Sequence, residues 1–94
     1  MLGIVIEWEL KDMNNAFARK MVADELRETL AFCGLIEEWH CKTKEVDKSG
    51  KTFYTLDMSK LGKIKVYSPK FILINDVKMT SLREAREYIG RTYV

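Results

Sequence analysis

The stretch TFYTLDMSKLGKIKVYSPKFILINDVKM, residues 52–79, decides the fold, because it alternates apolar and polar residues between closely spaced turn signals. This alternation predicts short strands at Thr52–Met58 and Lys63–Tyr67, and the wholly apolar run Phe71–Ile74 is the next candidate, with Val77–Met79 as its returning arm. Asn75 and Asp76 tolerate the positive φ angles of a tight turn. Because short turns favour pairing between consecutive strands, the stretch predicts an antiparallel sheet.

Upstream of this stretch, the sequence predicts a strand, a long helix and a second strand. Leu2–Leu10 alternates strictly, with one wholly apolar face, as a half-buried strand does. Apolar residues then recur at three- and four-residue steps over 18–33, which indicates an amphipathic helix that ends at Gly34. Leu35–Val46 is expected to be the next strand, and the polar residues 47–50 its turn.

Downstream, the sequence predicts a short helix at the C-terminus. Ser81 and Glu84 match the capping box, in which each side chain bonds a backbone amide of the other residue. Gly90 is the expected end of this helix. The whole chain of 94 residues is therefore expected to form one α+β domain. We predict a small, mostly antiparallel sheet in β-α-β-β-β-(β)-α order, with a long N-terminal and a short C-terminal helix packed on one face.

Composition excludes several classes of protein. The apolar share of 47% and the charged share of 32% are typical of a globular chain rather than a disordered one. No apolar run approaches the roughly 20 residues of a membrane helix, and no secretory signal opens the sequence. Only two cysteines occur, Cys33 and Cys41. We therefore expect a cytoplasmic protein with reduced thiols and no membrane partner.

Charge is distributed unevenly along the chain. Residues 1–47 carry 6 basic against 10 acidic side chains, whereas residues 48–94 carry 10 basic against 4 acidic ones. Lysines on a sheet could follow a phosphate backbone while neighbouring rings stack on bases. The candidate nucleic-acid-binding residues are Lys42, Lys44, Lys48, Lys51, Lys63, Lys65 and Tyr67. The alternative is that these lysines protect exposed strand edges from aggregation.

Aromatic side chains are numerous for so small a core. Exposed rings often anchor protein interfaces, and an unpaired strand edge is a ready surface for dimerisation. The candidate interface residues are Trp8, Phe53, Phe71 and Tyr88. We therefore expect a protein partner or a homodimer, although a ring-rich core would explain the same composition.

The sequence contains little evidence for a catalytic site. Glu7 and Glu9 share one face of the first predicted strand, and Glu38 and His40 share one face of the second. Such groups could hold a divalent ion if the strands were adjacent, but polar residues are expected on solvent-facing strands anyway. Cys41 would point away from His40 on a strand, which argues against a nucleophilic pair. We predict no catalytic residues, no metal site and no cofactor.

One family resemblance bears on function. The first predicted strand, the long helix and residues 32–38 resemble the βαβ start of the small ferredoxin-like nucleases of CRISPR adaptation and of virulence-associated protein D. The resemblance implies an aspartate at the end of the first strand. The corresponding residues 7–12 place the only aspartate late, at Asp12.

Three functions are thus expected, in a definite order. The first is a small non-catalytic binding or regulatory module that acts through a protein partner and self-association. The first alternative is binding of RNA or single-stranded DNA through the lysine-rich strands 42–70. The second alternative is a metal-dependent nuclease that uses Asp12 and the carboxylates of the two predicted strands.

Overall fold

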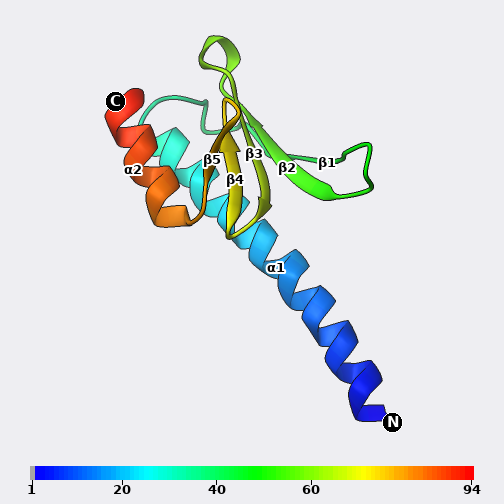
Figure 1. Cartoon of the computed structure of the whole chain (residues 1–94). Coiled ribbons are helices and arrows are strands. Elements are labelled where there is room, and N and C mark those ends of the chain that lie inside the picture. Colours follow the sequence, from blue (N-terminus) through cyan, green and yellow to red (C-terminus); the bar gives the residue numbers. More distant parts are fainter. Residues whose placement is uncertain (1) are drawn as a thin grey trace.

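The computed structural model describes the backbone of residues 2–94 and the side chains of residues 16–94. The elements are α1 (Leu2–Phe32), β1 (Thr43–Val46), β2 (Thr52–Asp57), the 3₁₀ turn η1 (Ser59–Leu61), β3 (Lys63–Ser68), β4 (Phe71–Ile74), β5 (Val77–Met79) and α2 (Leu82–Thr92). The strands form one five-stranded sheet in the order β1-β2-β3-β4-β5, and the helices lie on one of its faces (Figure 1). The predicted α+β class is confirmed.

Every strand of the sheet pairs antiparallel with the next one along the chain. Asn75 and Asp76 make the turn between β4 and β5 with φ angles of 49° and 69°, as their residue types predict. The register between β3 and β4 shifts between Val66 and Ser68, directly before Pro69. Because proline has no N–H to donate, the regular hydrogen-bond ladder between β3 and β4 is interrupted at this point.

The core lies between the sheet and the helices. Its fully buried side chains come from α1, from three strands and from α2, namely Leu26, Leu30, Leu56, Ile64, Val66, Ile72, Ile74 and Ile89. Burying a side chain of this size contributes roughly 1.5–3 kcal/mol relative to leaving it in water. The alternation in residues 52–79 therefore places one row of each strand in this core.

The strand predicted at Leu2–Leu10 is wrong, because α1 begins at Leu2. A short apolar run does not distinguish a strand from a helix by period alone. No glycine or proline lies between this run and the helix that follows, and its glutamates and leucines favour a helix. Within residues 2–94 no strand precedes α1, so the resemblance to the ferredoxin-like nucleases, which starts from a βαβ unit, is not supported.

The strand predicted at Leu35–Val46 is also too long, since only Thr43–Val46 is extended in the sheet. Arg27 of α1 explains the difference. Its guanidinium donates to the backbone carbonyl of His40 at 2.7 Å and to that of Glu38. These carbonyls are therefore bound to a side chain instead of a strand ladder, and residues 35–42 cross the end of α1 as a loop.

The helix ends are predicted in part. Gly34 closes α1 with a φ of 75°, as expected. Ser81 caps α2 by accepting a bond from the Glu84 amide at 3.0 Å, which confirms the capping serine. The predicted end at Gly90 is wrong, because α2 continues to Thr92. Glycine costs a helix only about 1 kcal/mol, so the buried Ile89 and the cap outweigh it.

Candidate binding surface

One face of the sheet carries no helix in the described part of the chain (Figure 1). Because side chains alternate along a strand, the residues between the buried ones point to this side. We call it the open face. Its residues are Thr43, Glu45, Phe53, Thr55, Asp57, Lys63, Lys65, Tyr67, Phe71, Leu73 and Lys78.

A row of rings crosses the open face from β2 to β4. Phe53 stacks on Tyr67 with ring centroids 4.9 Å apart, and Tyr67 meets Phe71 edge-on at 5.1 Å. The first distance equals the spacing of neighbouring strands, roughly 4.8 Å. Phe53 and Tyr67 therefore stand side by side, with their faces turned toward each other.

Two lysines lie over the outer rings of this row. The Lys65 ammonium is 5.6 Å from the centroid of Phe53, and that of Lys78 is 4.9 Å from Phe71. Contacts of this kind contribute about 0.5–1 kcal/mol each at exposed sites. They help to leave Phe53 only 7% exposed although no helix covers it, while Phe71 stays 37% exposed.

The charges of the open face separate by strand. The acidic residues Glu45 and Asp57 lie on β1 and β2, and the lysines 63, 65 and 78 lie on β3 and β5. Asp57 and Lys63 are direct cross-strand partners, a pairing that stabilises adjacent strands. Glu45 accepts a hydrogen bond from the Thr55 hydroxyl. The face is therefore mixed in charge rather than uniformly basic.

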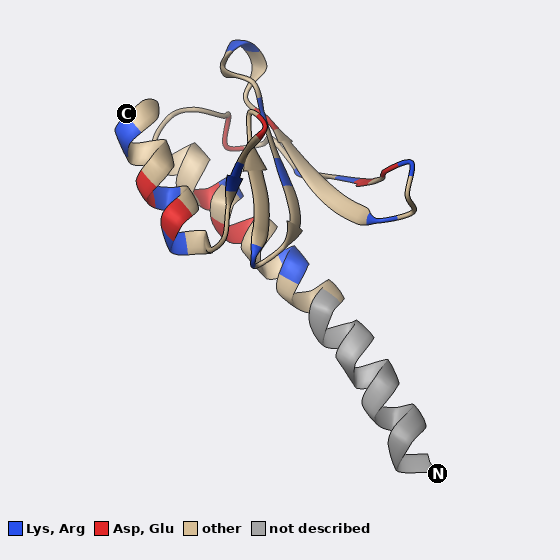
Figure 2. Cartoon of the chain, viewed as in Figure 1, with Lys and Arg blue, Asp and Glu red and all other residues tan. Residues whose placement is uncertain are grey.

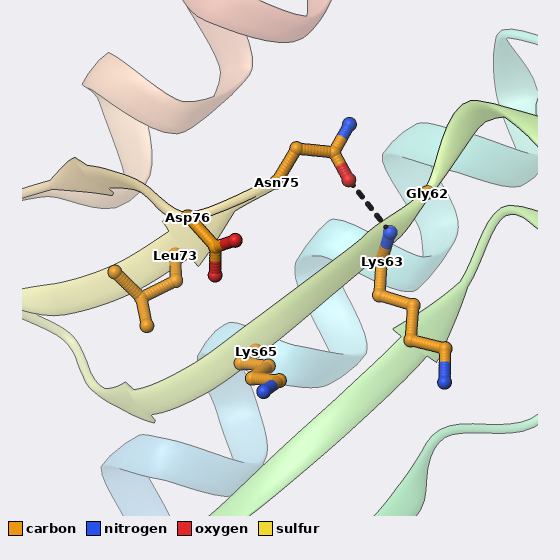
Figure 3. A pocket seen from close by; sticks show the side chains of 6 residues that line it. All are labelled: Gly62, Lys63, Lys65, Leu73, Asn75 and Asp76. Atoms are coloured by element: carbon orange, nitrogen blue, oxygen red, sulfur yellow. Dashed lines mark hydrogen bonds between the residues drawn. The ribbon is translucent and has the colours of Figure 1, made fainter.

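A hollow of about 260 Å³ lies at the η1 end of the open face, where Lys63, Lys65 and Leu73 line it (Figure 3). Asp76 and Asn75 form its other side. The Asn75 carboxamide accepts from the Lys63 amide at 2.9 Å, so this rim is fixed by hydrogen bonds to the backbone.

A larger hollow, of about 840 Å³, lies at the opposite end, between the β1–β2 turn and Phe71. Asp47 accepts from the Ser49 hydroxyl at 2.7 Å and from the amides of Ser49 and Lys51 at 2.9 Å each. These bonds lower the pKa of the Asp47 carboxyl below its ordinary value. Desolvation, together with the Asp47 carboxylate, raises the pKa of Tyr67, so its hydroxyl stays a neutral donor.

The predicted nucleic-acid-binding lysines do not gather on one surface. Lys63, Lys65 and Tyr67 share the open face, but Lys44 pairs with Tyr54 on the opposite side of the sheet. Lys48 and Lys51 lie at the β1–β2 turn. Figure 2 shows basic residues spread over the sheet, its turns and both helices.

Lys42 is held by groups on the helix side of the sheet. Its ammonium lies 2.6 Å from a carboxylate oxygen of Asp24 and 5.5 Å from the centre of the Tyr54 ring. A phosphate would have to compete with both contacts. The structure therefore separates Lys42 from the lysines of the open face.

The predicted interface residues also divide. Phe53 and Phe71 both belong to the ring row, where each contacts Tyr67. Tyr88, in contrast, is half-buried against Tyr93 beside the core. Trp8 lies outside the residues whose side chains are described. The sequence did not single out Lys78, although its place opposite Leu73 follows from the β4–β5 hairpin.

A second apolar surface lies on the helix side. Phe17 and Met21 of α1 are 63% and 48% exposed. Met21, Pro69 and Leu82 line a hollow of about 270 Å³ between α1 and the start of α2. Nothing in the described residues covers this surface.

Among the described residues, no three His, Cys, Asp or Glu side chains gather closely enough to hold a metal ion. Glu7, Glu9 and Asp12 lie outside the described side chains. In the same part of the chain no helix is apolar over a length that could cross a bilayer. Cys33 and Cys41 are free thiols.

The comparisons with known proteins add no relative. The chain matches no family model, no curated protein and no solved structure. Function is therefore argued from the chemistry of the open face.

Proposed function

We propose that the chain is a small non-catalytic binding module that contacts a protein, either a different chain or a second copy, through the open face. The supporting observation is the ring row of Phe53, Tyr67 and Phe71 on the face of the sheet that carries no helix. Aromatic side chains surrounded by polar groups are the usual anchors of protein interfaces. The two free cysteines suit the cytoplasm, where thiols stay reduced, and we place the protein there.

The orientation of the rings favours a protein over a nucleic acid. Bases stack on ring faces that are open to solvent. Here one face of Phe53 lies against Tyr67 and Lys65 approaches the ring, while Phe71 is approached by Lys78. A base would have to displace these neighbours, whereas an apolar protein side chain can pack against the exposed part of Phe71 and the half-exposed Tyr67.

Site-specific photocrosslinking in cells tests the proposal. A photoreactive phenylalanine analogue at Phe71 should give adducts with a defined protein. The same analogue at Trp39 is the control, because Trp39 is 76% exposed but lies outside the open face. Adducts at Trp39 and none at Phe71 would refute the open face as a protein-contact surface.

The second candidate function is binding of RNA or single-stranded DNA. The observation in its favour is that Lys63, Lys65 and Lys78 lie on the same face as the rings. Neutralising phosphates releases counterions, so binding to a mixed oligonucleotide should weaken steeply as salt rises. Lys65→Glu should then reduce affinity at least tenfold and Lys20→Glu, on α1, should not. No binding at low salt removes this candidate.

A further inference from the structure

The open face carries one adjacent pair of opposite charges, Asp57 and Lys63, that the same pair of a second copy can meet. Acidic residues occupy its β1–β2 half and lysines its β3–β5 half. A two-fold axis parallel to the strands and between β2 and β3 brings each half over the opposite half of a second copy. Closed homo-oligomers most often use such a two-fold contact, in which the same patch serves both subunits.

This symmetry determines which residues meet. Strand β2 of one copy lies over β3 of its partner, so each β2 residue faces the residue with which it pairs inside its own chain. Asp57 comes opposite Lys63 of the partner subunit, and Phe53 opposite Tyr67 of the partner subunit. Asp57 then has one lysine beside it and one across from it, and the like charges of this group are only diagonal neighbours. The paired rings form a central apolar cluster.

Self-pairing through the edge strand β1 is disfavoured by the same kind of argument. The Asp47 amide bonds the Lys51 carbonyl, so by alternation the outward-facing backbone groups of β1 belong to Lys44 and Val46. Two antiparallel copies of β1 centred on Lys44 would place two lysines opposite each other. A shift that avoids this places Glu45 opposite Glu45. Like charges directly opposite destabilise a strand pair.

We infer that the open face binds the open face of a second copy, in a face-to-face dimer about this two-fold axis. The inference rests on the proposed function, since it names the partner at the same surface. Packed sheets lie about 10 Å apart with interdigitated side chains, which the upright rings allow. The overlap of about four strands is small beside permanent interfaces, so we expect association at micromolar or higher concentrations.

Charge reversal tests the dimer. Lys63→Glu makes the group of four charges that Asp57 and Lys63 form with their copies wholly acidic, and Asp57→Lys makes it wholly basic. Each variant alone should dissociate at least tenfold more readily than the wild type in analytical ultracentrifugation. An equimolar mixture should recover the dimer, because each charge then meets its opposite across the interface. Lys20→Glu makes the same charge change as Lys63→Glu on α1 and should dimerise like the wild type.

Folding must be controlled, because Asp57 also accepts a hydrogen bond from the Ser59 amide at 2.8 Å. Asp57→Asn keeps an acceptor there and removes only the charge, so it should weaken the dimer without unfolding the chain. Circular dichroism of every variant checks this point. A dimer that persists in both reversal variants, or a mixture of two folded variants that stays monomeric, would overturn the inference.

Failure of the dimer can be separated from failure of the proposed function. A wild type that stays monomeric at millimolar concentration, but still crosslinks another protein from Phe71, refutes the dimer and leaves the binding module standing. A monomer that crosslinks nothing from Phe71 refutes both. A monomer that binds an oligonucleotide, and loses it in Lys63→Glu, also refutes both and supports the nucleic-acid function.

Discussion

The side chain of Asn75 fills the space that a side chain on Gly62 would occupy. The Asn75 carboxamide accepts from the Lys63 amide at 2.9 Å, and its NH₂ group donates to the Leu61 carbonyl and the Tyr93 hydroxyl at 2.7 Å each. The β4–β5 turn is thereby tied to η1 and to the C-terminal end of α2. These contacts close one end of the sheet, next to the hollow of Figure 3.

Gly62→Ala should be strongly destabilising. Gly62 has φ 106° and ψ −152°, a region that is essentially restricted to glycine. A side chain there costs about 1–3 kcal/mol in backbone strain, and the added methyl group also overlaps the Asn75 carboxamide. We expect a loss of about 2–4 kcal/mol in the free energy of unfolding, measured by urea denaturation. A loss below about 0.5 kcal/mol would contradict this packing.

Gly90→Ala is the matched substitution with the opposite sign. Gly90 lies inside α2, and a Cβ atom there would have no neighbour within 4 Å. Alanine reduces the entropy of the unfolded chain and favours the helix, so stability should rise by about 0.5–1 kcal/mol. The same urea experiment measures it. A decrease would mean that α2 does not continue through residue 90.

Arg27→Met should loosen the loop that joins α1 to β1. The substitution keeps most of the aliphatic chain and removes the bonds to the carbonyls of Glu38 and His40. Backbone amides of residues 35–42 should then exchange hydrogen faster in mass spectrometry, while β3 and β4 keep their protection. Lys20→Met, on the exposed surface of α1, is the control. Unchanged exchange in the loop would show that Arg27 does not hold it.

Local patterns predicted the sheet well where each strand pairs with the next strand along the chain. The segments from Thr52 to Met79 have one buried row each and turn residues between them, so their pairing follows from short-range signals. The segments that precede this stretch were harder to predict. Leu2–Leu10 alternates like a strand but belongs to α1, and residues 35–42 alternate but are held by a side chain 13 positions away from His40.

The candidate surface was predictable only in its parts. Phe53, Phe71, Lys63, Lys65 and Tyr67 were all candidates, but for two different functions. Their meeting on one face depends on the register of β2, β3 and β4, which the sequence does not state. Likewise, the ion pair between Lys42 and Asp24 depends on how α1 crosses the sheet.

Ser81→Ala should destabilise α2 by about 1 kcal/mol, because the Glu84 amide loses its capping hydroxyl. The loss should be visible in thermal unfolding. Ser81→Asp restores an acceptor and places a negative charge at the helix N-terminus, so it should recover most of the stability. Equal losses in both variants would show that the cap contributes nothing.

The stability that Asp47 provides should depend on pH in the acid range. Its folded pKa lies below the ordinary aspartate value of 3.8, so the unfolded state binds the proton first as pH falls. The contribution is therefore complete above about pH 5 and disappears as pH falls through the folded pKa. Asp47→Asn keeps an oxygen acceptor without the charge. The melting temperatures of wild type and Asp47→Asn should differ at neutral pH and converge toward pH 2.

Ser49→Ala provides the companion measurement, because the Ser49 hydroxyl is the largest cause of the lowered pKa. Without this donor the Asp47 pKa should move back toward its ordinary value. The loss of stability in acid should then be smaller than in the wild type. Parallel melting curves for wild type and Asp47→Asn from pH 7 to pH 2 would show instead that the carboxylate gains nothing from the β1–β2 turn, whose wall forms part of the hollow beside Tyr67.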